Sequence, residues 1–153
     1  MSDVVPVVLG SEKLTSIFGR WPSFHDAEVH ELRLHRGHGN ASAERDSSPY
    51  LTAKLHTWLM TNVVDEKGYL GRTNHILVTM KFCDLDEDFK MEGFNRQNVI
   101  FGLDIEEKTR EDGTTPCFAV EFEPCYGMYA TFTCRHIEIL EAIPCDDRGN
   151  PLS

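Results

Sequence analysis

Alternation of apolar and polar residues is the dominant pattern along this chain. In the C-terminal half, Phe118, Val120 and Phe122 share one parity, and Phe132 and Cys134 repeat the pattern further on. A period of two places successive side chains on opposite faces of a strand, so each run has one core face and one solvent face. The pattern therefore predicts antiparallel strands that are half exposed to solvent.

About six strands are expected from these runs. They cover residues 27–36, 50–61, 75–83, 98–107, 117–123 and 128–140. The parity changes near His30–Glu31 in the first strand and near Arg135–His136 in the last, which predicts a β-bulge at each position. We expect an α+β, mainly β protein, with a twisted and mostly antiparallel sheet and a short N-terminal helix.

The helix is predicted just before the first strand. Ser11 can cap it, and Leu14, Ile17 and Phe18 are spaced to lie on one apolar face. Gly19 is placed to end the helix, because glycine adopts the left-handed conformation that commonly follows a C-terminus.

A single domain is expected over residues 1–153, since a chain of this length favours one hydrophobic core. Residues 1–10 are expected to form an extended lead-in. Residues 37–49, which are rich in small and polar side chains, are expected to form a flexible loop, and residues 144–153 a tail.

Charge narrows the range of partners. The chain carries 25 acidic and 15 basic residues, a net charge of −10. Nucleic acid and anionic membranes are poor partners for such a chain, whereas a basic protein would be attracted over a long range. Five cysteines without a C-x-x-C pair, and no recognisable secretion signal, favour reduced thiols in a cytoplasmic protein.

Acidic residues form the largest concentration of one charge sign, and they are our candidates for partner binding. Two interpretations are open for them: a contact surface for a basic protein, or solvation and protection of a sheet edge. The candidates are Asp84, Asp86, Glu87, Asp88, Asp104, Glu106 and Glu107.

Candidate chemistry is sparse. His25, Asp26, Glu28 and His30 are suitable zinc ligands, but their spacing matches no known metal signature, and a solvated strand face is the favoured interpretation. Ser23 lies too close in sequence to His25 and Asp26 for a catalytic triad, which is assembled from distant segments. We therefore assign no catalytic, cofactor-binding or metal-binding residue.

One more acidic pair lies on the strand predicted over residues 117–123. Glu121 and Glu123 alternate with the apolar residues of their strand, and they are expected to form its solvent face.

Four segments carry a resemblance to a known family. The most specific lies within residues 17–29, and looser ones cover residues 75–82, 94–99 and 122–127. The specific segment reads Trp21-Pro22-Ser23-Phe24-His25-Asp26-Ala27-Glu28. Together they resemble the immunity protein 50 family of bacterial polymorphic-toxin systems. Cys125 stands where a serine would be expected, and the 37–49 insertion looks longer than typical.

The resemblance implies a cytoplasmic antidote that binds a cognate toxin and blocks it, without catalysis and without a cofactor. It names neither the toxin nor the contact residues. Two other functions stay open: a metal-binding protein or small enzyme that uses His25, Asp26, Glu28 and His30, and an interaction module that forms a homodimer through an exposed strand.

Overall fold

The computed structural model describes residues 8–38, 48–64, 66–68, 70–109 and 116–152. These residues form one helix and nine strands. The elements are β1 (Val8–Leu9), α1 (Glu12–Phe18), β2 (Glu28–His35), β3 (Tyr50–Val64), β4 (Leu70–Cys83), β5 (Lys90–Glu92), β6 (Val99–Thr109), β7 (Pro116–Tyr126), β8 (Tyr129–Cys134) and β9 (His136–Pro144).

The mainly β prediction with a short helix is confirmed, but the expected number of about six strands is wrong. Strands β1 and β5 have only two and three residues, too few for a period of two to be read from the sequence. The predicted strand 128–140 is divided at Arg135 into β8 and β9.

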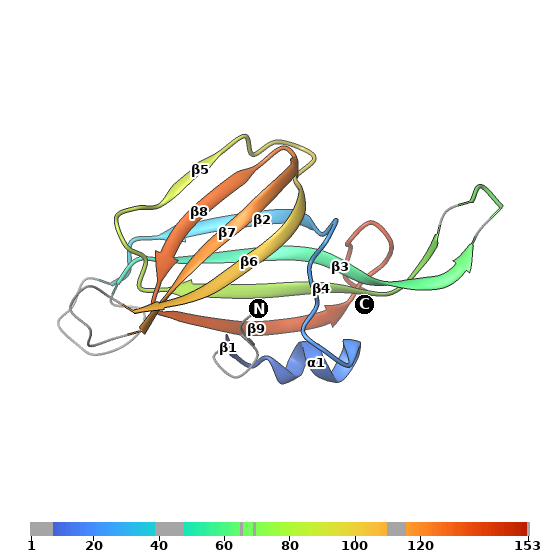
Figure 1. Ribbon diagram of the computed structural model, residues 1–153, viewed down its shortest axis with the longest axis horizontal. Helices are drawn as coiled ribbons and strands as arrows, with labels where there is room; N and C mark the ends of the chain where they lie inside the picture. Colours follow the sequence, from blue (N-terminus) through green and yellow to red (C-terminus); the bar gives the residue numbers. More distant parts are fainter. Residues whose placement is uncertain (1–7, 39–47, 65, 69, 110–115, 153) are drawn as a thin grey trace.

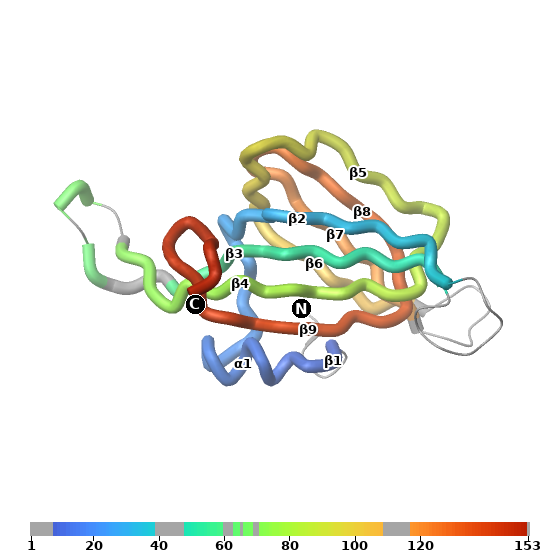
Figure 2. The backbone as a smooth tube through the Cα atoms, turned by 180° about the vertical axis from the view of Figure 1, so that it is seen from behind, coloured from blue at the N-terminus to red at the C-terminus, as the bar shows by residue number. Residues whose placement is uncertain are grey.

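The nine strands form one open sheet in the order β1-β9-β4-β3-β2-β6-β7-β8-β5. All neighbours are antiparallel except β1 and β9, which run parallel. The sheet folds over on itself, so that β5 to β8 lie across β2, β3, β4 and β9 (Figures 1 and 2). We call β1, β9, β4, β3 and β2 the first layer and β6, β7, β8 and β5 the second layer.

The two layers join where β2 meets β6. Backbone hydrogen bonds run from Asp26 N to Ile100 O at 3.0 Å, from Ile100 N to Ala27 O at 3.0 Å and from Val29 N to Asn98 O at 2.7 Å. The register of β2 on β3 shifts between Val29 and Glu31, which confirms the first predicted bulge. A bulge increases local twist, and here it lies beside the fold in the sheet.

The layers meet a second time where β8 continues into β9. Arg135 interrupts the strand, and its backbone N donates to Cys83 O at 3.0 Å. The chain thereby leaves β7, the partner of β8, and pairs with β4 instead. The second predicted bulge is therefore wrong: the parity change near Arg135–His136 marks a crossing between layers, and the register of β9 on β4 shifts instead between Thr79 and Met80.

Aromatic side chains fill the space between the layers. Phe82 on β4 lies with its ring centroid 5.1 Å from Phe132 on β8 and 6.0 Å from Phe122 on β7, edge to face in both cases. All three are almost completely buried. Most of their inward-facing neighbours are apolar residues that the alternation selects. Phe101 is an exception: it shares the apolar parity of Ile105, which predicts a core position, but it is 58% exposed because the register of β6 on β7 shifts beside it.

Helix α1 packs along β9 at the edge of the first layer (Figure 1). Leu14 and Phe18 are buried, and Gly19 ends the helix at φ 77°, as predicted. Ser11 differs from the prediction in one respect, because its carbonyl accepts from Leu14 and Thr15 while its hydroxyl makes no capping bond. The described helix is too short and too polar to cross a membrane.

The predicted terminal and loop segments have different outcomes. Residues 1–7 and 39–47 lie outside the described residues, but β1 occupies part of the expected lead-in. The expected tail instead folds back, since Cys145 pairs with Pro151 and Leu152 N donates to Pro144 O at 3.2 Å. A single domain over 1–153 stays a prediction.

Replacing Phe82 by Ala is expected to destabilise the protein by about 3–5 kcal/mol, because it leaves a cavity between the layers. Urea unfolding followed by circular dichroism measures this loss. Phe101→Ala is the matched control: its side chain is 58% exposed, so the change should stay within about 0.5 kcal/mol. Equal losses in both variants would show that Phe82 does not occupy the centre of the core.

Candidate functional site

Carboxylates converge on the outer surface of the second layer. Asp104 on β6 lies opposite Glu121 on β7, and Glu123 follows two residues later on the same side of β7. Oxygen atoms from these three side chains all lie within 4.8 Å of one another. We name the acidic face by its five members, Asp88, Asp104, Glu106, Glu121 and Glu123.

A shallow groove of about 360 Å³ runs across this face. Its acidic lining comes from Asp88, Asp104, Glu106 and Glu121, and Lys108 is a basic residue among them. Asp88 is held in place, because one carboxylate oxygen accepts from Thr133 N at 3.1 Å and the other from Thr133 Oγ1 at 2.6 Å. The groove is therefore negatively charged, and its walls belong to paired strands or are tied to them.

The structure brings together only part of the predicted acidic set. Asp88, Asp104 and Glu106 share the groove. Asp84 instead lies 3.2 Å from Arg135 Nε at the junction of β8 and β9. Glu107 has the parity of Ile105, whose side chain points into the core, so it does not share the face of Asp104 and Glu106.

Asp86 and Glu87 lie in the same connection between β4 and β5 as Asp84. The backbone N of Asp86 donates to Thr133 O at 2.9 Å, which ties this connection to β8. Neither residue lines the groove.

Glu121 and Glu123 belong to the acidic face although sequence reasoning treated them as an ordinary solvent face. Cross-strand pairing is what unites them with Asp104, and a single strand read alone does not reveal it. The available signal was the matching parity of Asp104 and Glu106 on one predicted strand and Glu121 and Glu123 on the next, joined by a turn.

Chemically, this arrangement can attract positive charge. Carboxylate oxygens at this spacing suit a hard cation such as Ca²⁺, and Asp104, Glu121 and Glu123 are the residues that could hold one. The same oxygens can accept hydrogen bonds from a Lys or Arg side chain of a protein partner. The groove is open to solvent, so it favours a surface contact over an enclosed reaction.

The alternative metal cluster at residues 25–30 does not assemble. His25 Nδ1 lies 2.8 Å from Phe101 O and its Nε2 lies 3.6 Å from Asp26 Oδ2. His30 instead has its ring 6.0 Å from that of His56 on β3. Within the described residues, no three-ligand group contains His25, Asp26, Glu28 or His30.

Cys134 and Ser23 are not arranged as nucleophiles. Burial raises the pKa of the Cys134 thiol well above its usual value, and Cys83 and Cys117 raise it further. A protonated thiol is a poor nucleophile. Ser23 Oγ accepts from the backbone N of His25 at 3.2 Å, and the His25 ring is occupied with Phe101 O, so Ser23 and His25 do not form a catalytic pair.

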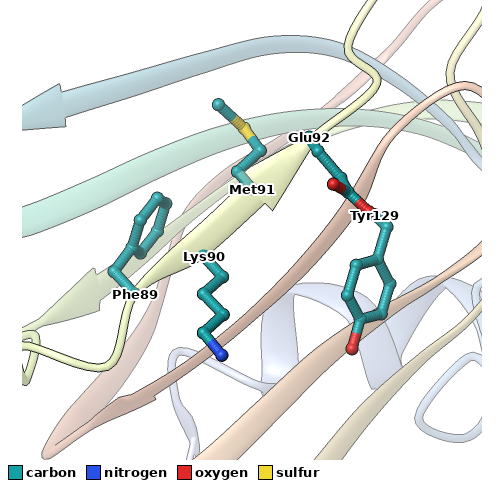
Figure 3. A pocket seen from close by; sticks show the side chains of 5 residues that line it. All are labelled: Phe89, Lys90, Met91, Glu92 and Tyr129. Atoms are coloured by element: carbon teal, nitrogen blue, oxygen red, sulfur yellow. The ribbon is translucent and has the colours of Figure 1, made fainter.

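A second pocket, of about 490 Å³, lies at the edge strand β5. Figure 3 shows Phe89 and Met91 on one side of the strand, and Lys90 with the Tyr129 hydroxyl on the other. Homodimer formation through such an exposed strand stays a prediction.

Repulsion within the acidic face should be measurable. Glu121→Gln is expected to raise the free energy of unfolding by about 0.2–1 kcal/mol at low salt, because it removes one of three clustered like charges. The gain should shrink in 0.5 M salt. Glu107→Gln removes the same charge from the opposite side of β6, and urea unfolding of both variants provides the comparison. A gain that is equal in both variants would contradict the clustering.

Comparison with known proteins gives one match. The family model described as Immunity protein 50 matches residues 10–144. No curated protein and no solved structure matches the chain. Because the matched region covers most of the 153 residues, the chain belongs to the Immunity protein 50 family.

Proposed function

We propose that this protein neutralises a cognate bacterial toxin in the cytoplasm, by binding a basic surface of the toxin with its acidic face. Membership of an immunity protein family supports a binding role. The observation that carries the proposal is the gathering of five carboxylates on one side of the second layer, in a chain of net charge −10.

Electrostatics would act first in the association. A concentrated negative field accelerates the encounter with a basic partner and orients it before contact. The acidic residues of β6 and β7 project from paired strands, whose backbone is already ordered. Binding would then require little ordering of the antidote, and the loss of conformational freedom on association stays small.

An exposed aromatic residue lies at one end of the acidic face. Phe101 is the unpaired residue between Ile100 and Gly102, where the register of β6 on β7 shifts. A bulge re-aims a side chain, and this one is 58% exposed with its ring against that of His25 at 5.0 Å. The next residue, Gly102, is the register partner of Glu123. Phe101 is therefore placed to act as an apolar contact at the rim of the charged surface.

Neutralising the acidic face should slow association. The triple variant Asp104→Asn, Glu121→Gln, Glu123→Gln is expected to lower the association rate for the toxin encoded beside this gene at least tenfold at low salt, with little change at high salt. Stopped-flow mixing or surface plasmon resonance at two ionic strengths measures this. A variant that loses three charges elsewhere, Glu12→Gln, Glu66→Gln, Glu107→Gln, controls for net charge. Equal slowing in both would place the contact outside the acidic face.

Removing the aromatic side chain should act on dissociation. Phe101→Ala is expected to raise the dissociation rate tenfold or more and to leave the association rate nearly unchanged, because apolar contacts form after the charged encounter. The same kinetic experiment measures both rates. Tyr126→Ala, another exposed aromatic of the second layer, is the control. An unchanged dissociation rate for Phe101→Ala would remove this residue from the interface.

A further inference from the structure

Three histidines from three neighbouring strands meet on the outer surface of the first layer. His30 lies in the bulge of β2, His56 on β3 and His75 on β4. His56 Nε2 is 2.9 Å from His75 Nδ1, which is a hydrogen bond, and the rings of His30 and His56 are 6.0 Å apart, edge to face. We call these three residues the histidine cluster. The cluster is separate from the acidic face, and the spacing of its members in the sequence does not reveal it.

The segment 145–152, which we call the C-terminal loop, packs against this cluster. Its first residue, Cys145, donates its backbone N to His75 O at 3.0 Å. Gly149 lies so close to His30 that a Cβ at this position would overlap the imidazole ring. His56 is on the outer side of the sheet and is nevertheless only 2% exposed. Figure 2 shows the C-terminal loop beside β3 and β4, where their hairpin leaves the sheet.

The C-terminal loop is held together mainly by its own polar contacts. Asp146 Oδ1 accepts from the backbone N of Arg148 and of Asn150, both at 2.9 Å, and these bonds lower the pKa of the Asp146 carboxyl. Gly149 N donates to Asp146 O at 3.1 Å. The loop can therefore move away from the sheet as a unit without losing these bonds.

The surroundings of His56 disfavour a second proton. Burial lowers its pKa from 6.5 to about 4, and the neighbouring His75, His30 and Arg72 act in the same direction, against the carboxylate of Asp146. These groups face it from β2, β4 and the C-terminal loop, and Glu28 is its register partner on β2. The hydrogen bond between His56 and His75 needs a lone pair on one ring, so it is lost when both rings are fully protonated.

We propose that the histidine cluster makes closure of the C-terminal loop sensitive to acid: neutral His56 is buried beneath the closed loop, and protonation of His56 stabilises an open loop in which the ring is solvated. This device lies on the first layer and does not depend on the proposed toxin contact.

The direction follows from proton linkage. His56 has the lower pKa in the closed state, so the open state binds more protons between pH 6.5 and about 4. The equilibrium constant for closure of the loop is highest above pH 6.5. It falls about tenfold for each pH unit below that, down to about pH 4.

Hydrogen exchange of the purified protein tests this directly. The amide of Cys145, whose hydrogen bond to His75 O joins the C-terminal loop to β4, should lose protection by about tenfold per pH unit from pH 6.5 to 4.5, after correction for intrinsic exchange rates. The amide of Gly149, whose bond to Asp146 O lies within the loop, should keep its protection. His56→Gln retains a partner for His75 but takes no proton. The protection of the Cys145 amide in this variant should therefore not vary with pH. His136→Gln, which changes an exposed histidine outside the cluster, should behave like the unchanged protein. Protection that is constant with pH in the unchanged protein, or a pH dependence that persists in His56→Gln, would overturn the proposal.

A second variant addresses the loop itself. Gly149→Ala should hold the loop open at every pH, because the added Cβ overlaps His30 and the residue has φ +84°. NMR titration of the His56 ring should then show its pKa moving from about 4 towards 6.5. If the titration of His56 is unmoved in this variant, the loop is not what buries the ring. This variant decides the question even if His56→Gln fails to fold.

Discussion

The pairing of residues 26–29 with residues 98–100, at the start of β6, is the constraint on which the rest of the structure depends. It joins the two layers through backbone bonds between Asp26, Ala27, Ile100 and their neighbours, and it requires an unusual backbone. Phe24 and Asp26 have φ of 59° and 66°. Such angles are strained for a residue as bulky as Phe, so the surroundings must compensate. Phe24 is buried, with its ring 5.8 Å from that of Trp21, and this packing offsets the strain.

Three of the segments that carry the family resemblance meet at this corner. The buried Asn98 side chain accepts from Asn95 N at 2.8 Å and donates to Asn95 O at 2.6 Å, which shapes the approach to β6. The backbone of Gly127 lies so close to Gln97 O that a side chain there would collide. Residues 21–28, 94–99 and 122–127 therefore lie together where the sheet folds over.

Sequence reasoning predicted what depends on local periodicity. The strand faces with Phe118, Val120 and Phe122 and the bulge at His30 follow from parity, and the helix end at Gly19 follows from backbone chemistry. Contacts between side chains of different strands were not accessible in the same way. Parity indicates which side of a strand a residue occupies, but not which strand lies beside it. The convergence of Asp104 with Glu121 and the meeting of His56 with His75 depend on the register between two consecutive strands, which parity does not fix.

The folded sheet separates two kinds of outer surface. The second layer presents carboxylates at a rigid and open groove, whereas the first layer carries histidines beneath a folded-back loop. The inner surfaces of both layers are buried in the core. A partner can therefore contact only an outer face, an edge or the hairpin of β3 and β4, which projects from the sheet (Figure 1). Under the proposed function, charge favours the second layer among these. The groove there is acidic and exposed, and it has the composition that a basic partner requires.

A hydrogen-exchange footprint of the complex with the toxin encoded beside this gene tests the central claim most directly. The account predicts slower exchange along β6, β7 and β8, with the hairpin of β3 and β4 and the C-terminal loop unchanged. Protection confined to that hairpin or to the first layer, with β6 to β8 exchanging as in the free protein, would contradict it.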